Sequence, residues 1–189
     1  MVEPMSVGLA ALQKAGVGAG SKVLIAGAGP IGLITVAVAK ALGAVEIMIT
    51  DLSGERLGRA ARMGATTTFN MAEPGVTIPP AHFDAFIECS GSAAAIRRGF
   101  PAIRPAGHVV LVGRGGDEVA LPVTLMQNRE LTVSGSFRYA NQFPVAIAMV
   151  ASGRVPYAEL LGERVTLDEL ASALEPARSG SGVKPIVHP

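Results

Sequence analysis

The sequence predicts an α/β fold in which helices cover both faces of a doubly wound parallel sheet. Three observations support this prediction. Short apolar runs rich in β-branched residues alternate with longer runs of Ala, Val and Leu, which is the pattern of repeated strand–helix–strand units. Several of the short runs end in Gly or Ser, at positions that face the ligand crevice of such a sheet. A turn with three glycines joins one strand to the helix that follows it.

Residues 22–51 combine these features in one unit. A strand, a glycine turn, a helix, a second strand and an acid follow one another there, which is the dinucleotide-binding fingerprint of the Rossmann fold in its required context. The alternatives are an ordinary strand–helix–strand unit and the methyl-donor-binding fold, which rarely keeps all three glycines. The parts are a strand over 22–26, the turn GAGPIG over 27–32, a helix over 33–42, a strand over 45–50, and Asp51.

Each glycine of the turn has a distinct physical role. Gly27 allows the tight turn out of the strand, Gly29 lets a pyrophosphate approach the backbone, and Gly32 lets the helix lie close to the strand. Pro30 suits the first helical turn, where its missing N–H matters least. The free N–H groups and the positive end of the helix therefore predict a diphosphate site.

The acid after the second strand predicts which dinucleotide is bound. Asp51 lies 19 residues after Gly32, close to the spacing of about 20 that places a carboxylate beside the adenosine ribose. Its charge would repel a 2′-phosphate by about 4 kcal/mol at about 4 Å and an effective dielectric constant of about 20. We therefore predict NAD as the cofactor in preference to NADP. Arg56 follows one helical turn later and can cover the adenosine, although without the fingerprint a solvated helix charge is the favoured interpretation.

The remaining elements complete a six-stranded sheet. A helix over 3–15 precedes the glycine unit, and Ser53 caps a helix that ends at Gly64. Residues 72–82 contain three prolines and no helical period, so the crossover helix normally found there is expected to be shortened or replaced by a loop. The other predictions are strands over 66–69, 83–89, 108–112, 131–135 and 183–188, helices over 92–103, 141–152 and 167–177, a stop over 104–107, and mixed structure over 156–165.

Composition excludes several other classes of protein. The 189 residues carry a net charge of +1 with no basic tract, which argues against a nucleic-acid partner. The longest apolar run, near residues 33–42, is too short to span a bilayer, and the start lacks a signal-peptide pattern, so we expect a soluble cytoplasmic protein without a membrane partner. The one cysteine, Cys89, is expected to be a small buried hydrophobe rather than a nucleophile, and His82 and His108 lack metal-ligand spacing.

The chain resembles the cofactor-binding portion of the zinc-dependent medium-chain dehydrogenases, in the sorbitol (polyol) dehydrogenase branch. The matching segments are collinear and cover nearly the whole chain, and EPMSVG and GSFRYAN are the most specific to that branch. The segments are EPMSVG, GAGPIG, ITDLSGERL, ECSG, VVLVG and GSFRYAN.

The resemblance implies a set of cofactor contacts. The glycine turn corresponds to the pyrophosphate contacts, Asp51 and Arg56 to the pair at the adenosine, and Cys89 to the strand end that borders the cofactor. Two further segments correspond to contacts beside the nicotinamide ring, although the branch often has an apolar residue where Arg114 stands. In order, the implied contacts are Gly27, Gly29, Pro30, Ile31, Gly32, Asp51, Arg56, Cys89, Val112, Gly113, Arg114, Ser136, Phe137 and Arg138.

The resemblance also implies catalytic and metal-site residues. Arg138 and Tyr139 correspond to the substrate pocket, where both can hydrogen-bond the hydroxyls of a polyol or secondary alcohol; a charged, aromatic strand-end loop is the alternative interpretation. Glu3 corresponds to the glutamate beside the catalytic zinc or its bound water. In this family zinc lowers the pKa of the alcohol, and the alkoxide passes hydride to the nicotinamide.

The sequence departs from the family in one respect: the β-rich zinc domain that carries a Cys and a His-Glu pair ahead of this region is absent. We therefore expect residues 1–189 to be an NAD-binding domain with remnants of the catalytic-domain junction at 1–16 and 155–189. Such a chain binds NAD but does not turn over alcohol alone, and zinc belongs only to the full-length enzyme.

Two other functions remain open from the sequence. The chain can be a stand-alone dinucleotide-binding or redox-sensing module, or the same fold can serve another reaction, such as oxidation of threonine or of a different secondary alcohol. The resemblance also implies a homodimer or homotetramer that pairs through the sixth strand, near the apolar stretch LTVSGSF.

Overall fold

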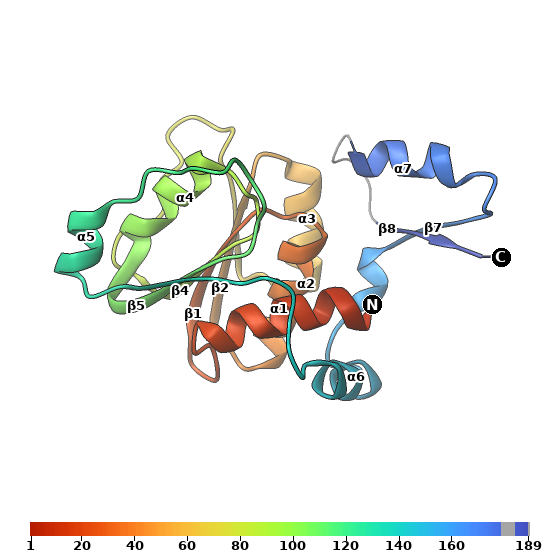
Figure 1. Ribbon diagram of the computed structural model, residues 1–189, viewed down its shortest axis with the longest axis horizontal. Helices are drawn as coiled ribbons and strands as arrows, with labels where there is room; N and C mark the ends of the chain where they lie inside the picture. The colour runs from red at the N-terminus through yellow and green to blue at the C-terminus, as the bar shows by residue number, and fades with distance from the viewer. Residues whose placement is uncertain (179–183, 189) are drawn as a thin grey trace.

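The computed structural model describes residues 1–178 and 184–188, and its main feature is a sheet of six parallel strands (Figure 1). The strand order is β3-β2-β1-β4-β5-β6, with helices on both faces, which confirms the predicted fold class. The order reverses between β1 and β4, and ligands of such sheets bind at that switch point. The strands are β1 Lys22–Ala26, β2 Glu46–Asp51, β3 Thr67–Asn70, β4 Phe83–Glu88, β5 Ile103–Leu111 and β6 Thr132–Gly135.

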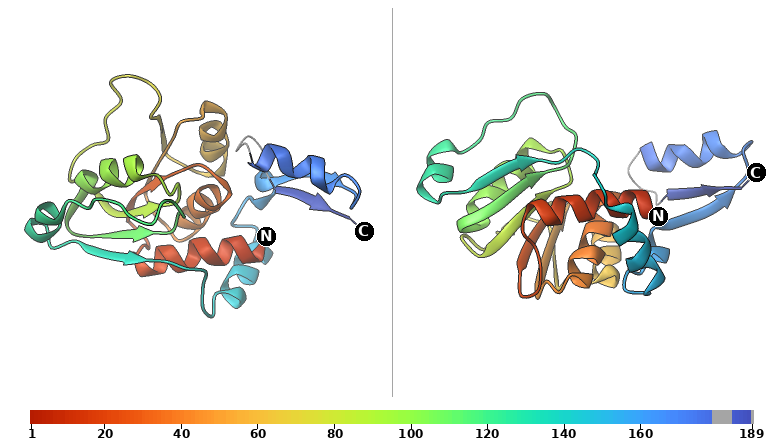
Figure 2. Two further views of the ribbon diagram at one scale, coloured as in Figure 1. Left: turned by 45° about the horizontal axis from the view of Figure 1, so that its top comes forward. Right: turned by 60° about the horizontal axis from the view of Figure 1, so that its bottom comes forward.

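The two faces of the sheet are covered by different helices (Figure 2). Helices α1, α2, α3 and α6 share one hydrophobic core with the first face, and α4 with the short 3₁₀ helix η1 covers the second. The bounds are α1 Val2–Lys14, α2 Pro30–Ala41, α3 Gly54–Met63, α4 Ala93–Gly99, η1 Phe100–Ala102, α5 Val123–Asn128 and α6 Phe143–Ala151.

The apolar run over residues 23–26 of β1 follows from this two-sided burial. Val23 and Ile25 face the core shared with α2, whereas Leu24 between them faces the core under α4. Because side chains alternate across a strand, a strand covered on both faces must be apolar at every position. Helix α2 lacks a polar stripe for a similar reason, since every residue from 32 to 39 is buried.

The connection between β3 and β4 is a loop, as the prolines predict. Residues 71–82 contain no helix, so this crossover leaves part of the second face of the sheet without a helical cover. The helix before β3 also agrees with the sequence prediction: the Ser53 hydroxyl accepts a hydrogen bond from the N–H of Arg56, and Gly64 ends the helix at φ +113°.

The prediction for residues 92–112 was wrong in one respect. The stop expected over 104–107 lies inside β5, which begins at Ile103 rather than at His108. Ile103 pairs with Phe83, and the register shifts before His108 pairs with Ala85, so the strand accommodates a bulge where we expected a break. The guanidinium of Arg104 pairs with the Asp84 carboxylate beside this bulge and holds the early part of β5 against β4.

The C-terminal residues form a small unit beside the main body (Figures 1 and 2). Strands β7 and β8 pair in a separate parallel sheet, and β7 was predicted only as mixed structure. Residue 183, the first of the predicted terminal strand, lies outside the described residues. The elements are η2 Tyr157–Leu160, β7 Leu161–Val165, α7 Leu170–Arg178 and β8 Lys184–Val187.

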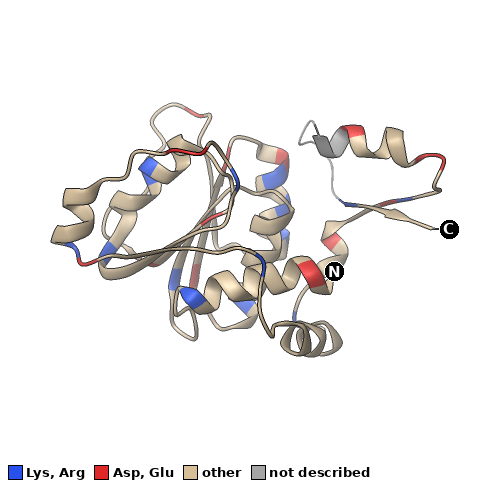
Figure 3. Cartoon of the chain, in the orientation of Figure 1, with Lys and Arg blue, Asp and Glu red and all other residues tan. Residues whose placement is uncertain are grey.

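Charged residues of both signs are interspersed over the elements, and α6 has none (Figure 3). Within the described residues, no helix combines the length and the hydrophobicity needed to cross a membrane.

A matched pair of glycines tests the packing under α4. A Cβ added at Gly99 would lie 2.2 Å from the ring of buried Phe86, whereas one added at the exposed Gly58 of α3 would reach only the Arg62 guanidinium at 4.0 Å. Both substitutions to Ala remove backbone entropy from the unfolded chain, so only packing separates them. We expect Gly99→Ala to lower the free energy of unfolding by about 1–3 kcal/mol and Gly58→Ala to raise it by about 0.5–1 kcal/mol.

Urea denaturation measures both changes, and equal effects of the two substitutions would contradict the packing observed under α4.

Candidate functional site

The glycine turn after β1 has the geometry that its spacing predicts. Gly27 adopts φ +93°, a left-handed conformation that favours glycine, and a Cβ there would lie 2.9 Å from Ser90. A Cβ added at Gly32 would lie 1.7 Å from the carbonyl oxygen of Gly27, so the first turn of α2 can approach the strand end only because this residue is glycine. A Cβ added at Gly29 would meet nothing within 4 Å, so the space in front of this residue is open.

The start of α2 offers unpaired backbone donors to that open space. The N–H groups of Gly29, Ile31 and Gly32 make no hydrogen bond to any described residue, and Pro30 has no N–H to offer. The first turn of α2 also contains no acidic side chain. Unpaired donors at the positive end of a helix form an anion site, so the residues present fit a diphosphate.

The carboxylate of Asp51 stands beside this turn at the end of β2. Its oxygens accept hydrogen bonds from the N–H of Ala28 at 2.6 Å and of Ser53 at 2.9 Å. The Arg56 guanidinium lies 3.9 Å from the same carboxylate, so the structure brings the predicted adenosine pair together. The Asp51 carboxylate thus holds the glycine turn and the start of α3 by hydrogen bonds, and it attracts the Arg56 guanidinium.

A cavity of about 600 Å³ opens next to Asp51 and Arg56. It lies at the carboxyl ends of β1, β2 and β4, on the face of the sheet where the crossover helix is missing. Its lining combines buried apolar side chains with polar and charged ones. The residues that line it include Leu24, Asp51, Glu55, Arg56, Met71, Ile78, Phe86, Ser90, Ser92, Ala95, Arg98 and Gly99.

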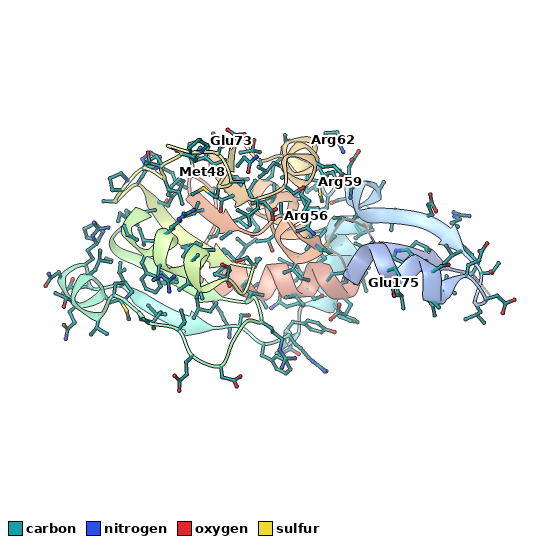
Figure 4. The ribbon with its side chains drawn as sticks, turned by 90° about the horizontal axis from the view of Figure 1, so that it is seen from above. Met48, Arg56, Arg59, Arg62, Glu73 and Glu175 are labelled. Atoms are coloured by element: carbon teal, nitrogen blue, oxygen red, sulfur yellow. The ribbon has the colours of Figure 1, made fainter. Side chains whose placement is uncertain are left out.

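A second, smaller hollow lies over the start of α2. Gly29 and Pro30 line it together with Arg56 and Arg59 of α3 and Lys184 of β8. Figure 4 shows Arg56, Arg59 and Arg62 in a row along α3. Arg56, Arg59 and Lys184 thus place three cationic side chains around a hollow that Gly29 also lines, and cations beside a helix start favour an anion there.

The end of β4 is organised by a buried carboxylate that sequence analysis did not single out. Glu88 is fully buried, and its side chain accepts hydrogen bonds from the N–H groups of Ser90 at 2.7 Å and of Gly91 at 2.9 Å and from the Ser90 hydroxyl. Its carbonyl oxygen accepts from the N–H groups of Val112 and Gly113, so the predicted segment after β5 is held against the end of β4.

The predicted nicotinamide and substrate residues lie apart from both hollows. The Ser136 hydroxyl is buried without a hydrogen-bond partner among the described residues. Phe137 is 73% exposed, and the Arg138 guanidinium lies 5.2 Å from the centre of its ring. Tyr139 stacks on Phe143. These side chains and Arg114 line neither hollow, so the structure assembles the adenosine and phosphate half of the predicted site more fully than the nicotinamide half.

Cys89 lies behind the glycine turn, 3.7 Å from the position of a Cβ added at Gly32. The residue keeps some exposed surface, but burial of its thiol raises its pKa to about 12. The neighbouring Glu88 carboxylate acts in the same direction, and the hydrogen bond with Thr35 opposes it. The thiol is therefore neutral at physiological pH and poorly suited to act as a nucleophile.

The described residues do not form a zinc centre. No three of their His, Cys, Asp or Glu side chains are grouped so that they could hold a metal ion. Glu3, the predicted metal-site residue, is exposed in the first turn of α1. His82 pairs with Glu46 at 2.9 Å, beside the amino ends of the strands and away from the carboxyl edge, and His108 lies within β5. A catalytic zinc site needs three protein ligands, so zinc does not fit the residues described.

Several residues at these hollows were not predicted as site residues. Ser90 and Ser92 follow a strand end, so their place at the carboxyl edge could have been recognised. Arg59 lies one turn beyond Arg56 on the same helix, and this spacing could have indicated it. Arg98 and Lys184 carry no sequence signal, because their positions depend on the loop over 71–82 and on the C-terminal unit.

Comparison with known proteins identifies relatives that are all dehydrogenases. A family model described as zinc-binding dehydrogenase matches residues 30–152. Sorbitol dehydrogenase of Homo sapiens is 38% identical over 195 aligned residues, which cover 97% of this chain and 54% of that protein. The chain thus spans about half the length of the curated relatives that it matches.

Solved structures agree with this result. The 2R,3R-butanediol dehydrogenase of Bacillus subtilis is 27% identical with a TM-score of 0.90, over 100% of this chain and 56% of that one. A zinc-binding dehydrogenase of Sinorhizobium meliloti 1021, solved with NADP bound, is 29% identical with a TM-score of 0.88, over 100% of this chain and 58% of that one.

The raised pKa of Cys89 predicts slow alkylation of the native protein. At pH 8, a thiol with a pKa of about 12 has on the order of 10³-fold less thiolate than an ordinary cysteine. We expect iodoacetamide to modify Cys89 at least about 100-fold more slowly in buffer than in denaturing urea, as measured by mass spectrometry. Equal rates in the two conditions would show that the thiol is neither buried nor electrostatically suppressed.

Proposed function

Since the chain belongs to the zinc-binding dehydrogenase family, we propose that it is the NAD-binding domain of an alcohol or polyol dehydrogenase. The observation that carries this proposal is the set of unpaired N–H groups at Gly29, Ile31 and Gly32, directly beside the Asp51 carboxylate. This arrangement fits a diphosphate joined to a ribose. The sorbitol dehydrogenases among the relatives support a polyhydroxylated alcohol as the substrate.

We propose the following roles for the residues of this chain. The N–H groups of the glycine turn bind the diphosphate, while Arg56, Arg59 and Lys184 balance its charge. Asp51 accepts hydrogen bonds from the ribose hydroxyls and keeps Arg56 over the adenosine. When bound, NAD supplies the hydride acceptor. Its nicotinamide end is proposed to extend toward the ends of β5 and β6, where the buried Ser136 hydroxyl has no hydrogen-bond partner among the described residues.

The nicotinamide and substrate contacts are a further part of the proposal. Val112, Gly113 and Arg114 follow β5, and Ser136, Phe137, Arg138 and Tyr139 follow the neighbouring strand β6, so both segments reach the carboxyl edge of the sheet. The zinc-dependent step is not assigned to the described residues, because they contain no group of metal ligands.

Pairing of two copies through β6 is proposed as well. This strand is an edge of the sheet with one neighbour, β5, and the exposed side chain of Phe137 follows it directly. An edge strand presents backbone groups that a second copy can pair with. The dimer is therefore expected to extend the sheet across this edge.

The choice of NAD over NADP rests on Asp51, because the Sinorhizobium relative was solved with NADP and family membership alone does not decide it. We expect calorimetry to show NAD binding at least about 100-fold more tightly than NADP, since two like charges near 4 Å repel by about 4 kcal/mol. Asp51→Asn should reduce this ratio to about tenfold or less, because the amide keeps an acceptor oxygen but loses the charge.

The matched control is Glu55→Gln, which removes the other acid that lines the cavity and should leave the ratio unchanged. Comparable affinity of the unaltered chain for NAD and NADP would refute the role of Asp51, and failure to bind either would refute the proposed function.

A further inference from the structure

The loop that carries the proposed nicotinamide and substrate contacts has a strained backbone. It covers residues 136–142, which join β6 to α6, and is called the β6–α6 loop. Among the residues that the structure describes, five that are not glycine adopt a left-handed φ, and Arg138 at +54° and Asn141 at +58° both lie in this loop. Asn accepts that region readily, but Arg does not. Such a conformation persists only where surrounding contacts hold it.

Two neighbouring side chains at the end of α1 hold the β6–α6 loop at both of its ends. At the start, the Lys14 ammonium donates a hydrogen bond to the carbonyl oxygen of Gly135 at 2.8 Å. At the other end, the Gln142 amide donates to the side-chain oxygen of Gln13 at 2.7 Å and to the carbonyl oxygen of Ala140 at 3.1 Å. Helix α1 packs against α2 in the main core and beside α6, so it is a fixed base for the loop (Figures 1 and 2).

The same loop contains two buried polar atoms that lack a protein partner. Within the part of the chain that the structure describes, the buried side-chain atoms without a hydrogen bond are the Ser136 hydroxyl oxygen and the Gln142 side-chain oxygen. Buried polar atoms are normally paired, so unpaired ones that gather in one loop indicate a place where a ligand or water completes the set. The loop is thus held in a strained conformation and still has hydrogen-bonding capacity to offer.

The burial of Gln142 makes its bond to Gln13 costly to lose. Gln142 is only 9% exposed, and its two amide N–H groups serve the Gln13 oxygen and the Ala140 carbonyl. Loss of the Gln13 acceptor leaves one buried N–H group unpaired, and water can reach that group only if the loop moves. The conformation of the β6–α6 loop therefore depends on an acceptor oxygen at residue 13.

We propose that Gln13 is a positioning residue for the nicotinamide end of the dinucleotide, acting through Gln142 on the β6–α6 loop. The inference rests on the proposed function, in which this loop contacts the nicotinamide. The diphosphate and adenosine contacts belong to the ends of β1 and β2 and do not involve the loop. A loosened loop therefore weakens the binding of NAD but not that of ADP-ribose, which lacks the nicotinamide.

Three variants test this proposal by calorimetry with NAD and ADP-ribose. Gln13→Met keeps the length and helix propensity of the side chain but removes the acceptor, whereas Gln13→Glu keeps an acceptor oxygen. The matched control is Gln127→Met, because Gln127 is also an exposed glutamine of a helix but lies on α5, ahead of the amino end of β6.

We expect Gln13→Met to weaken NAD binding about fivefold and ADP-ribose binding by less than about twofold, as loss of one partly buried hydrogen bond implies. Gln13→Glu and Gln127→Met should each leave both affinities within about twofold of the unaltered chain.

Three results would overturn the proposal while leaving the proposed function in place. Equal losses of NAD and ADP-ribose affinity in Gln13→Met would mean that the bond supports only the fold. Unchanged NAD affinity would mean that the loop does not depend on Gln13, and an equal loss in Gln13→Glu would exclude the acceptor oxygen as the cause. Failure of the unaltered chain to bind either ligand would overturn the proposed function together with this inference.

Discussion

The close approach of Gly32 to the Gly27 carbonyl is the contact on which the rest of the site depends. With no Cβ at either residue, the first turn of α2 begins directly at the end of β1, and its unpaired N–H groups face open space. A Cβ at Gly32 would lie 1.7 Å from the carbonyl oxygen, which no side-chain adjustment can relieve because the obstacle is backbone. The anion site and its distance from Asp51 therefore follow from a packing constraint.

Two buried or half-buried carboxylates fix the loops around that contact. Asp51 holds the glycine turn and the start of α3, and Glu88 holds the end of β4 against the segment after β5. A buried charge is tolerated only where several donors satisfy it, so each carboxylate keeps its loop in one conformation. The loops that line the crevice are thus held in place at the ends of β2 and β4, the two strands that flank β1.

The parts of the molecule that local chemistry determines could be predicted from the sequence. The bounds of β1, the Ser53 cap and the Gly64 stop depend on residues within a few positions of one another. The early start of β5 depends instead on the pairing of Ile103 with Phe83 and of Arg104 with Asp84, which the sequence does not display. The cavity beside Asp51 and the position of Arg98 next to it could not be predicted either. Both depend on the part of the sheet that stays open because the loop over 71–82 replaces a crossover helix.

The most direct measurement of the central claim is the change in backbone amide NMR signals on addition of NAD to the ¹⁵N-labelled chain. Unpaired N–H groups that bind a diphosphate predict the largest downfield shifts at Gly29, Ile31 and Gly32, with Lys22 and Val23 at the far end of β1 unaffected. Shifts spread evenly over the surface, or absent from the glycine turn while NAD binds elsewhere, would contradict the account.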